Sequence, residues 1–167
     1  FNKNWKRLGV VESIRQALSQ PDTHAPCVVS FGDVMFKRYL VREMLEQKGC
    51  DLVLAGVREN YIRNHYALRT NVPVTQFDES TNLRVDDVMH GNTHADMSRT
   101  AYFSGLMVIE NLALVLDVLA DIKKKATEDF FRTLLRRGAT MGIVYTSTDS
   151  IVDVNSAQDM LTASELD

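Results

Sequence analysis

Two acidic residues in distant parts of the chain have the surroundings of divalent-cation ligands. Asp33 follows the short apolar run of residues 27–31 and a glycine, and Asp153 follows the apolar pair Ile151 and Val152. In an open α/β sheet, ligands bind beyond the carboxyl ends of the strands, so both carboxylates are expected at one edge. Mg²⁺ is bound by one or two carboxylates together with phosphate oxygens and water. The pattern therefore predicts a magnesium site formed by Asp33 and Asp153.

Both residues also have a purely structural interpretation. Asp is a frequent helix N-cap and Gly-Asp is a frequent turn, so Asp33 could do no more than begin the following helix. Asp153 and Asp159 could likewise contribute only to a turn and to the start of the last helix. Gly32 favours a ligand, because a residue without a side chain allows close approach to the backbone. The spacing alone leaves both alternatives open.

The elements around Asp33 predict the fold class. Apolar residues at helical spacing predict a helix over 10–18, and Pro21 follows it as a stop. Residues 27–31 are typical of a strand buried on both faces in a parallel sheet. A helix is expected over 37–47, ended by Gly49, and a second buried strand over 51–57. This order predicts an α/β fold, with a Rossmann-like mixed, mainly parallel sheet flanked by helices.

The remainder of the chain continues this alternation less regularly. Residues 58–99 are more polar, and we expect small antiparallel strands and loops there, with candidate strands at 73–77 and 83–88. A strand is predicted over 100–109, helices over 112–122 and 128–136, and a strand over 139–145. The last helix is expected to begin at Asn155 as its N-cap and to run to about Ser164. Residues 1–167 are expected to form a single domain.

Composition excludes several classes of protein. The 167 residues are 45% hydrophobic and 25% charged, as in a globular domain, and the net charge of −3 argues against a nucleic-acid partner. The apolar stretch 106–122 is interrupted by Glu110, Asn111 and Asp117, and no secretory leader precedes it, so no membrane partner is expected. Cys27 and Cys50 lack the spacing of a metal site or a disulfide framework. These features favour a reducing, cytoplasmic location.

Three segments together resemble a known family. VVSFGDVMF (28–36), AYFSGL (101–106) and VDVNSAQDM (152–160) resemble the nucleotidylyltransferases of GT-A-like fold, in particular the cytidylyltransferases for phosphocholine or phosphonates, including domains found with phosphoenolpyruvate mutases. Residues 2–17 are similar to the family's N-x-x-Y…S-L-x-x-A segment. The resemblance implies that Asp33 and Asp153 are catalytic and hold Mg²⁺. The family's F-x-G-L glycine, which lies against the acceptor, corresponds to Gly105, with Ser104 beside it. As further hypotheses, Ser30, Gly32 and Asp33 contact the nucleotide, and Arg99, Tyr102 and Glu128 orient the acceptor. For Arg99, a guanidinium suited to phosphate, a solvated loop is the alternative.

The implied reaction is nucleotidyl transfer from a nucleoside triphosphate, CTP in this branch, to a small phosphate or phosphonate acceptor, with release of pyrophosphate. The family's G-x-G-x-R loop and later P-K are absent from these residues. The chain is therefore expected to be either the carboxyl-terminal part of such a domain or a degenerate relative with another role. In the first case, it would be joined to or associated with another domain upstream. The missing E-K-P stretch, and Val152 where many relatives have Glu or an aromatic, disfavour a sugar phosphate. Homo-oligomerisation is compatible with the sequence.

Two alternatives of other classes remain open at this point. One is a non-catalytic α/β module for ligand binding or oligomerisation, which the absent nucleotide loop favours. The other is a GT-A glycosyltransferase, although its usual D-x-D is not found, because Asp86 and Asp87 are adjacent rather than alternating.

Overall fold

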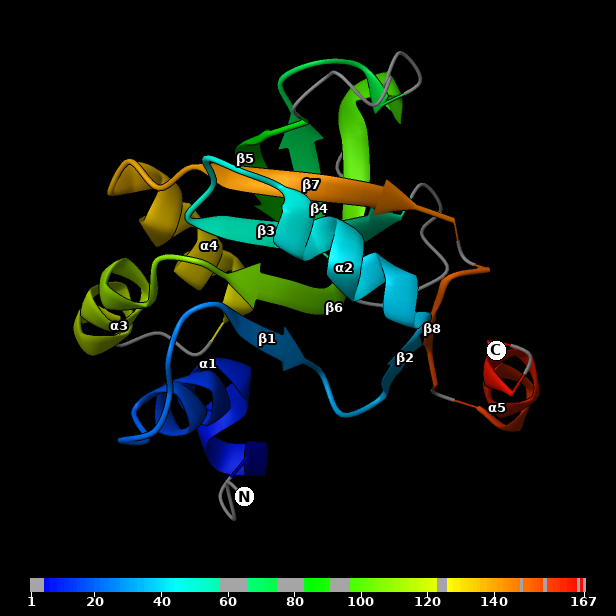
Figure 1. Cartoon of the computed structure of the whole chain (residues 1–167), viewed down its shortest axis with the longest axis horizontal. Coiled ribbons are helices and arrows are strands. Elements are labelled where there is room, and N and C mark those ends of the chain that lie inside the picture. Colours follow the sequence, from blue (N-terminus) through cyan, green and yellow to red (C-terminus); the bar gives the residue numbers. More distant parts are fainter. Residues whose placement is uncertain are drawn as a thin grey trace.

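A mixed six-stranded sheet forms the centre of the molecule (Figure 1). The computed structural model describes residues 5–57, 66–74, 83–90, 97–122, 126–147, 149–154, 156–164 and 166. The main sheet contains β1 (Cys27–Ser30), β3 (Leu52–Val57), β4 (Tyr66–Thr70), β5 (Val85–His90), β6 (Thr100–Ile109) and β7 (Met141–Thr146). Its order is β5-β4-β6-β3-β7, and β1 pairs with β6.

The strand directions show how the sheet is mixed. β3 and β7 pair in parallel, whereas β6 is antiparallel to β1, β3 and β4, and β5 is antiparallel to β4. β1, β3, β4 and β7 therefore run in one direction and β5 and β6 in the other. The α/β fold class is confirmed. All six residues of β3 are buried, because this central strand is covered on both faces.

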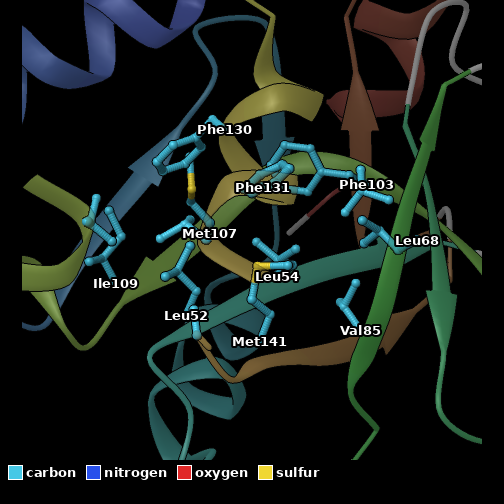
Figure 2. Close-up of a cluster of buried hydrophobic side chains, with 14 of the residues drawn as sticks. Leu52, Leu54, Leu68, Val85, Phe103, Met107, Ile109, Phe130, Phe131 and Met141 are labelled. Carbon is cyan, nitrogen blue, oxygen red and sulfur yellow. The ribbon is translucent and has the colours of Figure 1, made fainter. Parts of the chain in front are cut away.

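Helices cover the two faces of the sheet unequally. α2 (Arg38–Glu46) packs Leu40 and Met44 on one face. The opposite face is covered by α1 (Trp5–Leu18), α3 (Leu112–Asp121) and α4 (Thr127–Arg136). Figure 2 shows the cluster on that face, where Phe103 from β6 meets Phe131 from α4 edge to face with ring centroids 5.1 Å apart. The backbone of α1 is non-helical at Gly9, so the predicted helix over 10–18 is the part beyond this kink.

β6 contains an irregularity at the Ser-Gly-Leu sequence of residues 104–106. In its pairing with β3, Leu54 lies opposite Met107, and the next pair is Gly56 with Phe103. Between these two pairs the chain advances two residues in β3 but four in β6. Gly105 has a φ of +85°, a left-handed conformation that favours glycine. On the other side of β6, the partner changes at this place from β1 to β4. A β-bulge of this kind bends a strand and re-aims its neighbours.

A second, two-stranded sheet lies beside the main one. It pairs β2 (Val34–Phe36) with β8 (Ile151–Asp153) in antiparallel register, and we call it the β2–β8 ribbon. Val34 and Ile151 contribute to the core cluster on the α2 face, so the ribbon is packed on that side of the main sheet. α5 (Ala157–Ala163) follows β8 and lies apart from the other helices in Figure 1.

Three local predictions are wrong. β1 is not a parallel strand buried on both faces: it pairs antiparallel with β6, and its residues alternate between half-buried and exposed. A short apolar run is compatible with either environment, which is why periodicity alone did not separate them. The N-cap of α5 is Ser156, and Asn155 lies outside the described residues. The candidate strand at 73–77 is not a strand at Pro73 and Val74, and residues 75–77 lie outside the described part. The small antiparallel strands expected within 58–99 are observed as β4 and β5, whereas β2 was not predicted.

Candidate functional site

Asp33 lies in the turn between β1 and β2, beyond the carboxyl end of β1. Its side chain is exposed, and so are Ser30 and Gly32. A Cβ placed on Gly32 would meet no atom within 4 Å, so the backbone here is open to an approaching molecule. The hydroxyl of Ser30 donates to the Phe31 carbonyl at 3.0 Å. Asp33 does not cap α2, whose N-cap is Lys37, and the helix-cap interpretation of Asp33 is therefore excluded.

The β2–β8 ribbon brings Asp153 to Asp33. Asp153 is the last residue of β8 and lies directly opposite Val34 in the ladder. The next residue, Val154, donates its N–H to the carbonyl oxygen of Asp33 at 2.7 Å. Two acidic residues from distant parts of the sequence are thus neighbours across one pair of strands. They lie beyond the carboxyl ends of β1 and β7, the edge of an α/β sheet at which ligands bind.

The two carboxyl groups differ in their exposure to solvent. Asp33 is exposed, whereas Asp153 is half-buried and its Oδ1 atom is shielded from water. Within the described ranges, no cluster of three or more His, Cys, Asp or Glu side chains could form a metal cage. Mg²⁺ fits a pair of carboxylates, because it keeps water or substrate phosphates as its remaining ligands. The donor set of Asp33 and Asp153 is therefore suited to Mg²⁺ bound together with phosphate.

Asp159 has a separate, structural role. The Ser156 hydroxyl donates to Asp159 Oδ2 at 2.8 Å and accepts from the Asp159 N–H at 3.2 Å. These two contacts close the first turn of α5 at its N-cap. The helix-start interpretation is confirmed for Asp159.

Ser104 and Gly105 lie in the bulge of β6 and are enclosed by protein. Ser104 is 1% exposed, and its hydroxyl donates to the Ala55 carbonyl of β3 at 2.9 Å. The Gly105 carbonyl accepts the Phe31 N–H at 2.9 Å. A Cβ on Gly105 would lie 2.9 Å from Val34 Cγ2 and 3.1 Å from Phe31 Cδ2. Phe31 and Val34, which lie on either side of Asp33 in the chain, thus pack directly against Gly105. The bulge therefore supports the turn that carries the Asp33 carboxylate.

The other residues assigned to the acceptor are dispersed. Arg99 is exposed and directly precedes β6, while Tyr102 is 5% exposed and belongs to the core cluster on the α2 face. Glu128 is half-buried in the first turn of α4, on the opposite face of the sheet. The structure thus makes Asp33, which follows Ser30 and Gly32 in the same turn, a neighbour of Asp153. Tyr102 lies in the same core cluster as Val34 and Ile151 of the ribbon, whereas Glu128 is on the other face of the sheet.

The structure is similar to several solved nucleotidyltransferases. The inositol-1-phosphate CTP transferase from T. maritima superposes with a TM-score of 0.72 at 14% identity, over 99% of this chain and 64% of that one. A UDP-glucose pyrophosphorylase complexed with UDP-glucose gives 0.65 at 16% identity, over 93% and 60%. The CTP:phosphocholine cytidylyltransferase from Streptococcus pneumoniae gives 0.58 at 11% identity, over 99% and 67%.

These comparisons establish the fold. The chain has a nucleotidyltransferase-type α/β fold, as the resemblance of its motifs predicted, and it spans less than two thirds of the length of the first of these structures. No family model matches the chain, and no similar curated protein was found. Among the described helices, none has the length and apolar character needed to cross a bilayer.

Proposed function

We propose that this chain, as part of a complete domain of this fold, transfers a nucleotidyl group from a nucleoside triphosphate to a small phosphorylated or phosphonate acceptor and releases pyrophosphate. The observation that carries this proposal is the pairing of β2 with β8, which makes Asp33 and Asp153 neighbours at the ligand-binding edge of the sheet. The fold supports it, because the three similar structures named above are all enzymes of this class.

CTP is the proposed donor. Two of the similar structures are named as using CTP, with inositol-1-phosphate and phosphocholine as the other substrates. Both of these acceptors are small molecules with a phosphate group. This agrees with the motif resemblance, which favours phosphocholine or phosphonate acceptors over sugar phosphates.

The proposed reaction places modest demands on the side chains. An acceptor phosphate oxygen forms a bond to the α-phosphorus of CTP, while the bond from that phosphorus to the bridging oxygen breaks and pyrophosphate leaves with the electron pair. The attacking oxygen already carries negative charge near neutral pH, because the second pKa of a phosphate monoester is about 6. No residue therefore has to remove a proton from it. Positioning of the substrates and neutralisation of charge are what remain.

The residues at the sheet edge can meet these demands. Asp33 and Asp153 would hold Mg²⁺, which when bound supplies positive charge to the phosphates of the donor. The open backbone at Gly32 and the exposed Ser30 would lie against the nucleotide. The exposed Arg99 is the proposed contact for the acceptor's phosphate, because a guanidinium can bind two phosphate oxygens at once.

Pyrophosphate release from CTP tests the proposal. The full-length protein is incubated with CTP, Mg²⁺ and a panel of small phosphate and phosphonate acceptors, and product masses identify the group transferred. Asp33→Asn and Asp153→Asn are each expected to lower turnover on the order of 100-fold or more, since a transition-state charge contact is lost. The exposed Asp22 provides a matched control, and Asp22→Asn should retain normal turnover. Near-normal pyrophosphate release in both site variants would refute the metal assignment.

The same assay separates the two alternatives. Transfer of a sugar from a UDP-sugar, with no pyrophosphate released from CTP, would identify a glycosyltransferase instead. Calorimetric binding of CTP or a phosphorylated ligand without turnover of any donor would indicate a non-catalytic module.

A further inference from the structure

The end of the β2–β8 ribbon away from Asp153 is held by Ser150. This residue is 5% exposed, and it immediately precedes β8. Its carbonyl accepts the Lys37 N–H at 2.9 Å, and its own N–H donates to the Ser147 carbonyl at 3.1 Å. Its hydroxyl is hydrogen-bonded to the hydroxyl of Tyr39. Every polar group of Ser150 is therefore engaged, and two of its contacts connect β8 to the start of α2.

Tyr39 is attached to a rigid element. It lies in the first turn of α2, and the next residue, Leu40, is completely buried together with Met44 on the main sheet. The first turn of α2 lies beside β8 in Figure 1. Tyr39 is 38% exposed, so its packing contributes less to the core than that of Leu40 and Met44. The hydroxyl of Tyr39 is thus a fixed point outside the ribbon.

The ribbon needs such a fixed point for its register. Each strand has three residues, and the strands come from distant parts of the chain, so no tight turn sets which residues pair. A two-stranded sheet alone is marginally stable in water. A slip by one residue moves every side chain of a strand to the opposite face. A slip of β8 would therefore turn the Asp153 carboxylate away from the face that it shares with Val34 and Ile151.

We propose that Tyr39 and Ser150 are positioning residues for the site. Their hydroxyl-to-hydroxyl hydrogen bond reinforces the register of β8 against β2 that the backbone hydrogen bonds at the two ends of the ribbon define, and in this way it holds the Asp153 carboxylate in place relative to Asp33. The link to catalysis rests on the proposed function, whereas the register itself is a property of the fold. Neither residue touches the substrate or the metal in this scheme.

Amide hydrogen exchange tests the register directly. The reporter is the Val154 N–H, which donates to the Asp33 carbonyl at the far end of the ribbon. In Tyr39→Phe and in Ser150→Ala, we expect it to exchange about tenfold faster, because the ribbon opens locally more often. The double variant should be no faster than either single one. Thr133→Ala removes a comparable hydroxyl contact, to the Asp129 carbonyl on α4, and should leave Val154 unchanged.

Metal binding tests the consequence for the site. Mn²⁺ is titrated as the probe, and free Mn²⁺ is followed by electron paramagnetic resonance. Tyr39→Phe should weaken binding about tenfold, the lower end of what an outer-shell contact contributes, and Asp153→Asn should weaken it at least as much.

The outcomes separate the two proposals. If Asp153→Asn binds Mn²⁺ as tightly as the unchanged protein, the proposed metal site is wrong. If Asp153→Asn weakens binding and Tyr39→Phe does not, the positioning role alone is wrong. Unchanged exchange at Val154 in Tyr39→Phe, or faster exchange throughout the core, would also overturn the positioning role.

Discussion

Replacement of Gly105 by alanine should destabilise the protein for two separable reasons. The φ of +85° is unfavourable for any residue with a Cβ, at a cost of about 1–2 kcal/mol. The added Cβ would also lie 2.9 Å from Val34 Cγ2 and 3.1 Å from Phe31 Cδ2, which is closer than packed side chains allow. Overpacking of this kind costs about 1–3 kcal/mol. The free energy of unfolding should therefore fall by about 2–5 kcal/mol.

A second glycine separates the two contributions. Gly138 has a φ of +82°, and a Cβ there would meet no atom within 4 Å. Gly138→Ala should therefore cost only the backbone term, about 1–2 kcal/mol. Urea unfolding of both variants, with comparable m values, measures the difference. If the two losses agree within about 0.5 kcal/mol, the contact with Val34 and Phe31 has no energetic weight and the reasoning about the bulge is refuted.

Two further predictions concern the opposite edge of the sheet and the last helix. The Asp51 carboxylate accepts hydrogen bonds from Asn111 Nδ2 and from the Thr140 N–H, both at 2.8 Å. Asp51→Ala should therefore lower the free energy of unfolding, measured in urea, by about 2–4 kcal/mol. Mn²⁺ binding should be retained. A loss below about 0.5 kcal/mol would show that these contacts are not stabilising. Ser156→Ala removes the N-cap of α5 and should weaken that helix by about 1 kcal/mol. The Asp159 amide should then exchange faster, while the midpoint of urea unfolding of the whole chain stays unchanged. A shifted midpoint would mean that α5 is part of the cooperative core.

Much of the fold was predictable because the periodicity of the strongly apolar segments is unambiguous. The helix expected over 37–47 is observed as α2, and the strand expected over 100–109 is observed as β6 with the same limits. The sequence could not predict the pairing of β1. Its four residues do not show whether one face or both faces will be covered. Its partner, β6, lies about 70 residues later in the chain, so no local pattern shows whether the two strands pair parallel or antiparallel.

The proximity of Asp33 and Asp153 was predicted from the sequence, and their role as a metal site stays a prediction. The residue types at Asp33 and Asp153, each after a short apolar run, indicated carboxylates at a sheet edge, and the structure makes these residues neighbours. The hydrogen bond between Tyr39 and Ser150 had no signal in the sequence. Tyr39 has the spacing of a helix residue, and a serine before a strand is unremarkable, so only the packing of α2 against β8 reveals the contact.

The sequence by itself determined the alternation of helices and strands and the chemical types that the site could offer, because propensity and periodicity act over a few residues. Tertiary structure alone decided that β2 pairs with β8 and that the Gly105 bulge holds the turn at Asp33. Contacts of this kind join segments more than 70 residues apart. They depend on the shape and burial of the whole core, which no local pattern contains.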